Sequence, residues 1–132
     1  MHTYENLHIL IAEDDDDDAM IIEDIFKGNT SFSMIDIVRN GQELLDYLQH
    51  TAIPDIILTD INMPIMNGIE ALKSIFGSND LRKIPCFVYS TSINPLYESK
   101  CKKLGVKGYL VKPLSLEAFQ EIPKTILALL EK

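Results

Sequence analysis

Four short apolar runs in this sequence each end in residues whose side chains can do chemistry. The residues at these ends are Glu13 with Asp14, Asp60, Ser90 with Thr91, and Lys112 followed by Pro113. Three carboxylates in one crevice would repel one another, and a divalent cation such as Mg2+ would relieve the repulsion because it prefers oxygen ligands. A lysine and a hydroxyl could then hold the oxygens of a phosphoryl group while Asp60 attacks its phosphorus. The residue types therefore indicate formation of an aspartyl phosphate, a reaction that depends on positioning and charge neutralisation.

These side chains can meet only if the apolar runs lie side by side, and the order of segments along the chain predicts that they do. Apolar runs of strand length alternate with longer segments in which apolar residues recur at helical spacing. We expect strands at 7–12, 33–38, 55–59, 85–90 and 109–111, and helices from the acidic run to 28 and at 40–50, 67–77, 94–104 and 116–131. Such alternation predicts a doubly wound α/β fold, a five-stranded parallel sheet with helices on both faces. In such folds ligands gather at the carboxyl ends of the strands.

Length and composition limit the other possibilities. The chain has 132 residues, so we expect one domain over 1–132 with a core from about 7 to 130. The net charge of -8 argues against direct binding to nucleic acid. No apolar run has the length of a membrane span and no basic stretch leads into an apolar segment at the start, so we expect a cytoplasmic protein without membrane insertion. Cys86 and Cys101 lack metal-ligand spacing, which favours reduced structural thiols.

Four segments, at 9–14, 58–64 with 67–68, 88–91 and 108–113, carry a family resemblance. Together they resemble the response-regulator receiver domain, the CheY-like phosphoacceptor module of two-component signalling. The resemblance extends from about residue 7 to 130 and implies the strand order 2-1-3-4-5. It also favours Ser90 over Thr91 as the phosphate-binding hydroxyl, because Ser90 lies 22 positions before Lys112, as in the family.

The resemblance implies a role for each residue at the strand ends. Asp60 would be phosphorylated by a histidine kinase or a phosphotransfer protein. The ligands of Mg2+ would be Glu13, Asp14, Asp60 and the backbone carbonyl of Asn62. Ser90 and Lys112 would contact the phosphoryl group, and Tyr109 would rotate with Ser90 as a switch. A cis peptide bond before Pro113 is also implied.

Several assignments stay open at this point. The acidic run at 13–18 leaves the metal-binding pair uncertain, although Glu13 and Asp14 follow the strand directly. Tyr109 could instead pack with its hydroxyl in water. Asn62 and Ser92 could tune the access of water to the phosphoryl group. Pro123 has no amide to bond to the carbonyl of Phe119, so we expect a kink in the last helix that could alter an output surface.

The sequence thus predicts a switch that is read by protein contact. We expect no output domain, no turnover of a separate substrate beyond self-phosphorylation and autodephosphorylation, an unidentified downstream protein partner, and possible homodimer formation. Two alternatives stay open. One is a pseudo-receiver that binds partners without phosphorylation. The other is an aspartyl-phosphate phosphohydrolase, although such enzymes use a second carboxylate two residues after the nucleophile and this chain has Asn62 there.

Overall fold

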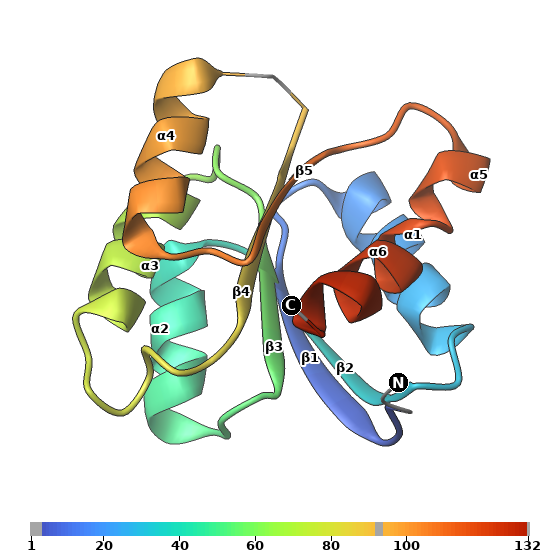
Figure 1. Cartoon of the computed structure of the whole chain (residues 1–132), viewed down its shortest axis with the longest axis horizontal. Helices are drawn as coiled ribbons and strands as arrows, with labels where there is room; N and C mark the ends of the chain where they lie inside the picture. Colours follow the sequence, from blue (N-terminus) through green and yellow to red (C-terminus); the bar gives the residue numbers. More distant parts are fainter. Residues whose placement is uncertain (1–3, 92–93, 132) are drawn as a thin grey trace.

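The fold is built around one parallel sheet of five strands. The structure is a computed structural model that describes residues 4–91 and 94–131. Its strands are β1 (Leu7–Ala12), β2 (Phe32–Val38), β3 (Ile56–Thr59), β4 (Cys86–Ser90) and β5 (Gly108–Val111). All neighbouring strands pair in parallel, and their order across the sheet is β2-β1-β3-β4-β5 (Figure 1). The predicted sheet and strand order are confirmed.

Helices cover both faces of this sheet. They are α1 (Asp16–Lys27), α2 (Gly41–His50), α3 (Gly68–Phe76), α4 (Pro95–Leu104), α5 (Leu116–Phe119) and α6 (Ile122–Leu130). Helices α1, α5 and α6 lie on one face, and α2, α3 and α4 lie on the other (Figure 1). Within 4–91 and 94–131, every helix falls short of the length and apolarity that crossing a bilayer requires.

Residue alternation along β1 divides the apolar core between the two faces. Ile9 and Ile11 belong to the cluster under α1 and α6, whereas Leu10 and Ala12 belong to the cluster under α2 and α3. All four side chains are fully buried. A parallel strand with both faces covered must be apolar at every position, which is why a continuous apolar run predicted this strand.

The hydrogen bonds of the sheet continue past the strand ends into the chemically important residues. The residues that follow β1, β3 and β5 donate their amides to the last carbonyl of a neighbouring strand: Glu13 to Val38 (2.9 Å), Asp60 to Ala12 (3.0 Å) and Lys112 to Ser90 (2.7 Å). Their backbones are therefore held in register by the sheet itself. The backbone of the site is therefore as rigid as the edge of the sheet.

The C-terminal helical segment differs from the prediction. Instead of one kinked helix over 116–131, the chain forms two helices, α5 and α6, with Gln120 and Glu121 in the turn between them. The amide of Glu121 donates to the carbonyl of Ala118 at 3.1 Å, a tightened contact that ends α5. Pro123 offers no amide to Phe119 and its ring would crowd that carbonyl, so the helix stops and restarts with Pro123 in its first turn. The prediction of a kink was wrong because the helix is interrupted, but Pro123 was correctly identified as the residue responsible.

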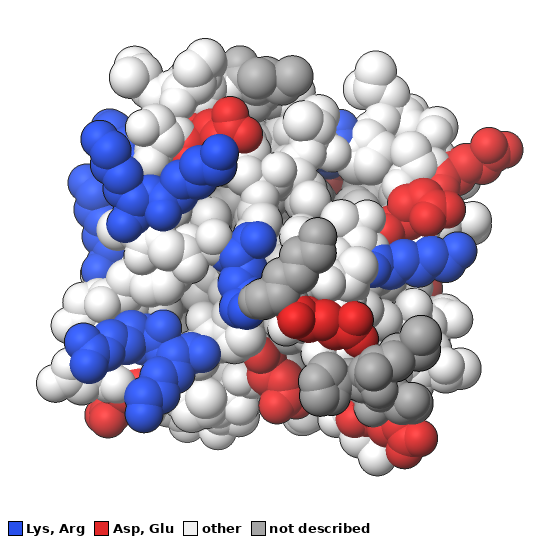
Figure 2. All heavy atoms as spheres, in the orientation of Figure 1, with Lys and Arg blue, Asp and Glu red and all other residues white. Residues whose placement is uncertain are grey.

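Charged side chains are unevenly distributed over the molecule. Residues 73–107 hold seven of the 12 Lys and Arg side chains but only two of the 20 Asp and Glu. Figure 2 shows Lys and Arg gathered on the side where α3 and α4 lie, whereas most Asp and Glu in that view lie toward α1, α5 and α6. Partners of opposite charge would therefore be steered to different sides of the domain.

The two cysteines are buried in the cluster under α2, α3 and α4. Cys86 is 1% exposed and Cys101 is fully buried, and neither forms a disulfide. Burial raises the pKa of the Cys86 thiol to about 12 and also raises that of Cys101. Because the thiolate is the reactive form, we expect Ellman's reagent to label neither thiol rapidly in the folded protein and both thiols in concentrated guanidinium chloride. Fast labelling of the folded protein would contradict their assignment as structural thiols.

Candidate functional site

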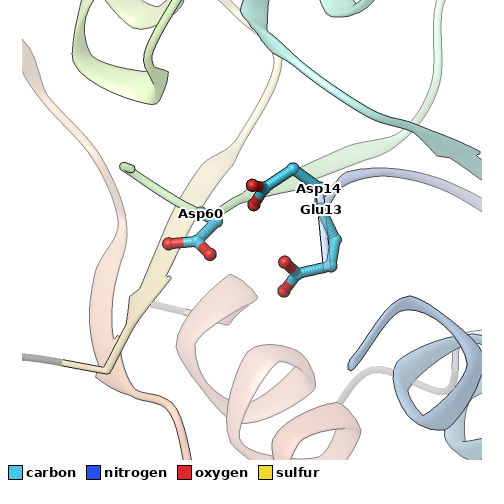
Figure 3. Close-up of side chains that lie close together, drawn as sticks. All are labelled: Glu13, Asp14 and Asp60. Atoms are coloured by element: carbon cyan, nitrogen blue, oxygen red, sulfur yellow. The ribbon is translucent and has the colours of Figure 1, made fainter. Parts of the chain in front are cut away.

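Three carboxylates meet at the carboxyl edge of the sheet. Glu13 and Asp14 follow β1, Asp60 follows β3, and oxygens of the three side chains lie within 4.8 Å of one another. Figure 3 shows the carboxylates of Glu13 and Asp14 turned toward the side on which Asp60 lies. Glu13 is fully buried and Asp60 is 7% exposed, whereas Asp14 is exposed. The structure thus brings together the three acids that the sequence pattern singled out.

Lys112 is the cation of this cluster. Its ammonium lies 2.8 Å from Glu13 Oε1, 2.9 Å from Asp60 Oδ2 and 3.2 Å from Asp18 Oδ2. Burial works against a charged lysine, but the bonds to Glu13 and Asp60 outweigh it and raise the pKa of Lys112. Partial burial and then the charge of Glu13 raise the pKa of Asp14. One ammonium therefore faces several carboxylates, and the cluster can accept further positive charge.

Local backbone packing fixes the position of Asp60. Its Oδ1 accepts the amide of Ile61 at 2.7 Å, and its carbonyl accepts the hydroxyl of Thr59 at 2.8 Å. At Gly68, the start of α3, a Cβ atom would lie 2.1 Å from the carbonyl oxygen of Asp60, so only glycine allows this approach. The Asn-Gly pair at 67–68 therefore does more than open a helix, because it lets α3 begin against the Asp60 backbone.

Two buried hydroxyls near the ends of β4 and β5 lack partners. Ser90 is fully buried whereas its neighbour Thr91 is exposed, so Ser90 is the residue whose hydroxyl faces the interior. Among the described residues, neither Ser90 Oγ nor the Tyr109 hydroxyl has a hydrogen-bond partner. The alternative in which the Tyr109 hydroxyl lies in water is therefore wrong. Burial raises the pKa of Tyr109, and the nearby Ser90 hydroxyl acts in the opposite direction without forming a well-aligned hydrogen bond. An unpartnered buried hydroxyl costs free energy, which an arriving acceptor would recover.

The acidic run at 13–18 divides into separate tasks. Asp15 is the N-cap of α1 and accepts the amide of Asp18 at 2.8 Å. Asp16 pairs with Arg39 at 2.7 Å, and Asp18 reaches Lys112. Because capping occupies Asp15, Glu13 and Asp14 are the members of the run that remain beside Asp60.

Three expectations taken from the family resemblance have different outcomes. No peptide bond in the described ranges is cis, so the expected cis bond before Pro113 is wrong. The trans form is favoured for most prolines, and Lys112 reaches Glu13 and Asp60 from it. Asn62 is exposed in the loop after β3, and its role as a carbonyl ligand stays a prediction. Ser92 lies outside the described residues.

Tyr89 is part of the site although the sequence analysis did not select it. Its hydroxyl donates to Glu13 Oε1 at 2.6 Å, and the Lys112 ammonium lies 4.9 Å from the centre of its ring. Burial and then the charge of Glu13 strongly raise the pKa of Tyr89, so the phenol stays protonated. Tyr89 was counted as one more apolar residue of β4. Alternation along the strand places Tyr89 on the sheet face of Leu58, two residues before Asp60, but it does not reveal the bond to Glu13.

The loop from β3 to α3 contains a strained residue. Ile65 has a φ of 70° and is 83% exposed. A β-branched residue is disfavoured at positive φ, whereas Asn tolerates it. We expect Ile65→Asn to increase the free energy of unfolding by about 1 kcal/mol in urea titrations. The matched control is Ile53→Asn, because Ile53 is 57% exposed and has no positive φ. Equal changes in the two variants would contradict release of strain.

Comparison with known proteins identifies the family. The response regulator receiver domain family matches residues 9–124. The chain therefore belongs to this family, whose members act in two-component signalling. The matched range contains every site residue described above.

The relatives and solved structures agree with this assignment. The chain is similar to the probable methanogenesis regulatory protein FilR2 of Methanothrix harundinacea, with 32% identity over 123 residues that cover 89% of this chain and 77% of FilR2. The structure of the phosphorylated cyanobacterial phytochrome response regulator RcpA superposes with a TM-score of 0.85 at 31% identity, covering 92% of this chain and 91% of that one. The Mn2+-bound form of response regulator Rcp1 gives a TM-score of 0.82 at 29% identity, covering 92% of each chain.

Proposed function

We propose that this receiver domain accepts a phosphoryl group on Asp60 from a phosphohistidine of a histidine kinase or phosphotransfer protein, with Mg2+ as cofactor. The observation that carries the proposal is the contact of 2.9 Å between the Lys112 ammonium and Asp60 Oδ2, beside the carboxylates of Glu13 and Asp14. A carboxylate next to a buried cation is placed to receive a group whose oxygens carry negative charge. The relative RcpA was solved in a phosphorylated form.

The donor set at the sheet edge fits a small divalent cation. Glu13, Asp14 and Asp60 offer hard oxygen ligands within 4.8 Å of one another, and a divalent cation would relieve the repulsion between these carboxylates. When bound, Mg2+ would supply neutralisation of the charge that develops on the phosphoryl oxygens. The Asn62 carbonyl is proposed as a further ligand because the family pattern assigns one there. The similar protein Rcp1 was solved in a Mn2+-bound form.

The residues of this chain would carry the transfer as follows. An oxygen of Asp60 forms a bond to phosphorus as the bond from phosphorus to the donor's imidazole nitrogen breaks, and the imidazole then takes up a proton from solvent. The amide of Ile61, which holds Oδ1 at 2.7 Å, fixes the plane of the attacking carboxylate. Lys112 exchanges its bond with Asp60 for one with a phosphoryl oxygen, which keeps the ammonium in place during the reaction.

A response to phosphorylation would follow from the two unpartnered hydroxyls. A phosphoryl oxygen offers Ser90 Oγ the acceptor that it lacks, and movement of Ser90 would change the surroundings of Tyr109. We infer that this change alters a surface that a downstream protein reads, with a homodimer as one form of that contact. The domain would then act on no separate substrate, because its chemistry is limited to gaining and losing its own phosphoryl group.

The test is incubation with acetyl phosphate and Mg2+ followed by intact mass spectrometry. We expect the mass to rise by one phosphoryl group and the adduct to be absent when EDTA removes the metal. A folded protein that gains no mass with either acetyl phosphate or a phosphorylated histidine donor would overturn the proposal in favour of a phosphorylation-independent interaction module.

A further inference from the structure

Tyr89 links the acidic side of the site to its lysine. Its hydroxyl bonds to Glu13, its ring lies beneath the Lys112 ammonium, and Lys112 bonds back to Glu13, so the three side chains form a closed set of contacts. We propose that Tyr89 is a positioning residue that holds Glu13 for the metal ion and seats Lys112 for the phosphoryl group. The inference rests on the proposed function of Asp60.

The Glu13 carboxylate has little freedom because donors occupy both of its oxygens. Oε1 accepts the Tyr89 hydroxyl at 2.6 Å and the Lys112 ammonium at 2.8 Å, and Oε2 accepts the Asp15 amide at 3.1 Å. The residue is fully buried, so water does not replace a donor that is removed. Of the two side-chain donors, Lys112 also has to serve the phosphoryl group, so Tyr89 is the one whose hydroxyl serves Glu13 alone. Partners of this kind orient a metal ligand without touching the metal.

The ring of Tyr89 has a separate task toward Lys112. The ammonium lies 4.9 Å from the ring centre, within the range of a cation–π contact, and both side chains are almost completely buried. The other partners of the ammonium are the carboxylates of Glu13, Asp18 and Asp60. When Asp60 becomes an acyl phosphate it loses its negative charge at that oxygen, whereas the aromatic ring does not change. Together with Glu13 and Asp18, the ring therefore gives the ammonium contacts that do not change during the transfer.

Consecutive residues of β4 contribute side chains to the site from opposite faces of the sheet. Tyr89 belongs to the core cluster under α1 and α6, and Val88 belongs to the cluster under the opposite helices. Because side chains alternate along a strand, Ser90 shares the face of Val88 and not that of Tyr89. Two consecutive residues thus contribute a hydroxyl to the phosphoryl side and a phenol to the side of the acid and the lysine.

Two substitutions separate the two tasks. Tyr89→Phe removes the hydroxyl but keeps the ring, so we expect the dissociation constant for Mg2+, measured by isothermal titration calorimetry, to rise about tenfold. At saturating Mg2+ the rate of phosphorylation by acetyl phosphate should be higher in this variant than in Tyr89→Leu, because Tyr89→Phe keeps the ring beside the Lys112 ammonium. Tyr89→Leu removes the ring as well, so we expect a loss of about tenfold in that rate even at saturating Mg2+.

The matched control is Tyr47→Phe. Tyr47 donates to the Asp36 carboxylate at 2.5 Å, but it lies in the cluster on the other face of the sheet. This control loses a bond of the same type at a partly exposed carboxylate, and its affinity for Mg2+ should stay at the wild-type value.

The outcomes separate this inference from the proposed function. Wild-type protein that binds Mg2+ and becomes phosphorylated, with Tyr89→Phe binding Mg2+ equally well, would overturn the inference and leave the function standing. If the wild-type protein accepts no phosphoryl group but Tyr89→Phe still has a lower affinity for Mg2+ than wild type, the proposed function is overturned and the metal-positioning role is supported. If Tyr47→Phe lowers the affinity for Mg2+ as much as Tyr89→Phe does, Tyr89 has only a structural role and the inference is overturned.

Discussion

Asp60→Asn should abolish phosphoryl uptake and leave the fold intact. The side-chain amide has the shape of the carboxylate and can still accept the Ile61 amide, but it is no longer an anionic nucleophile. The substitution also removes one of the carboxylates that compete for Lys112. Repulsion in the cluster falls, so the free energy of unfolding without metal should equal or exceed that of wild type. Intact mass after incubation with acetyl phosphate and Mg2+ should show no adduct, with an unchanged circular dichroism spectrum.

Asp55→Asn is the matched control for this loss. Asp55 lies just before β3, at the end of the strand away from Asp60, and its carboxylate accepts the amide of His8 at 2.8 Å. This variant should gain one phosphoryl group as wild type does, and hydroxylamine should remove it because acyl phosphates react with nucleophiles. A phosphoryl group that persists on Asp60→Asn at the wild-type level would remove Asp60 from its role.

Much of the fold was predictable because the strands of a doubly wound sheet are buried on both faces. Residues 9–12 and 56–59 are completely buried, and no charged side chain interrupts either run before the chain reaches the sheet edge. The first charged side chain after each run therefore marks the edge. The same rule predicts that Glu13, Asp60 and Lys112 line one crevice.

What the sequence did not yield depends on contacts between distant segments. Tyr89 and Glu13 are 76 positions apart, and no local pattern distinguishes a phenol that donates to a buried carboxylate from one that only fills the core. The ion pair between Asp18 and Lys112 depends on where α1 lies relative to Lys112, and the spacing of residues along α1 does not reveal that position. The break before Pro123 was underestimated for another reason, since whether a helix kinks or stops depends on how the following turn packs.

Replacing Lys112 with Met should destabilise the metal-free protein strongly. The Lys112 side chain is 5% exposed and its ammonium is the partner of Glu13, whose side chain is fully buried, so its removal leaves buried negative charge without a counterion. Breaking a buried ion pair in this way costs about 3 to 5 kcal/mol, far more than loss of a surface pair. Urea titration in EDTA should show that decrease in the free energy of unfolding. Lys124→Met, which removes a pair 3.9 Å long on the surface, should cost less than about 1 kcal/mol.

Mg2+ should restore much of the stability that Lys112→Met loses. With the ammonium gone, Glu13, Asp14 and Asp60 still offer oxygens within 4.8 Å of one another, and a bound cation then supplies the missing positive charge. Binding to the folded state alone stabilises it by about 2.7 kcal/mol at a hundredfold excess over the dissociation constant, and the variant should bind more tightly than wild type because no lysine competes. The difference in free energy of unfolding between wild type and Lys112→Met, measured in urea, should therefore become smaller when millimolar Mg2+ replaces EDTA. Phosphorylation of the variant should stay slow. If this difference in free energy of unfolding is the same with Mg2+ and with EDTA, the three acids do not form a metal site, and Lys112 has only a structural role among them.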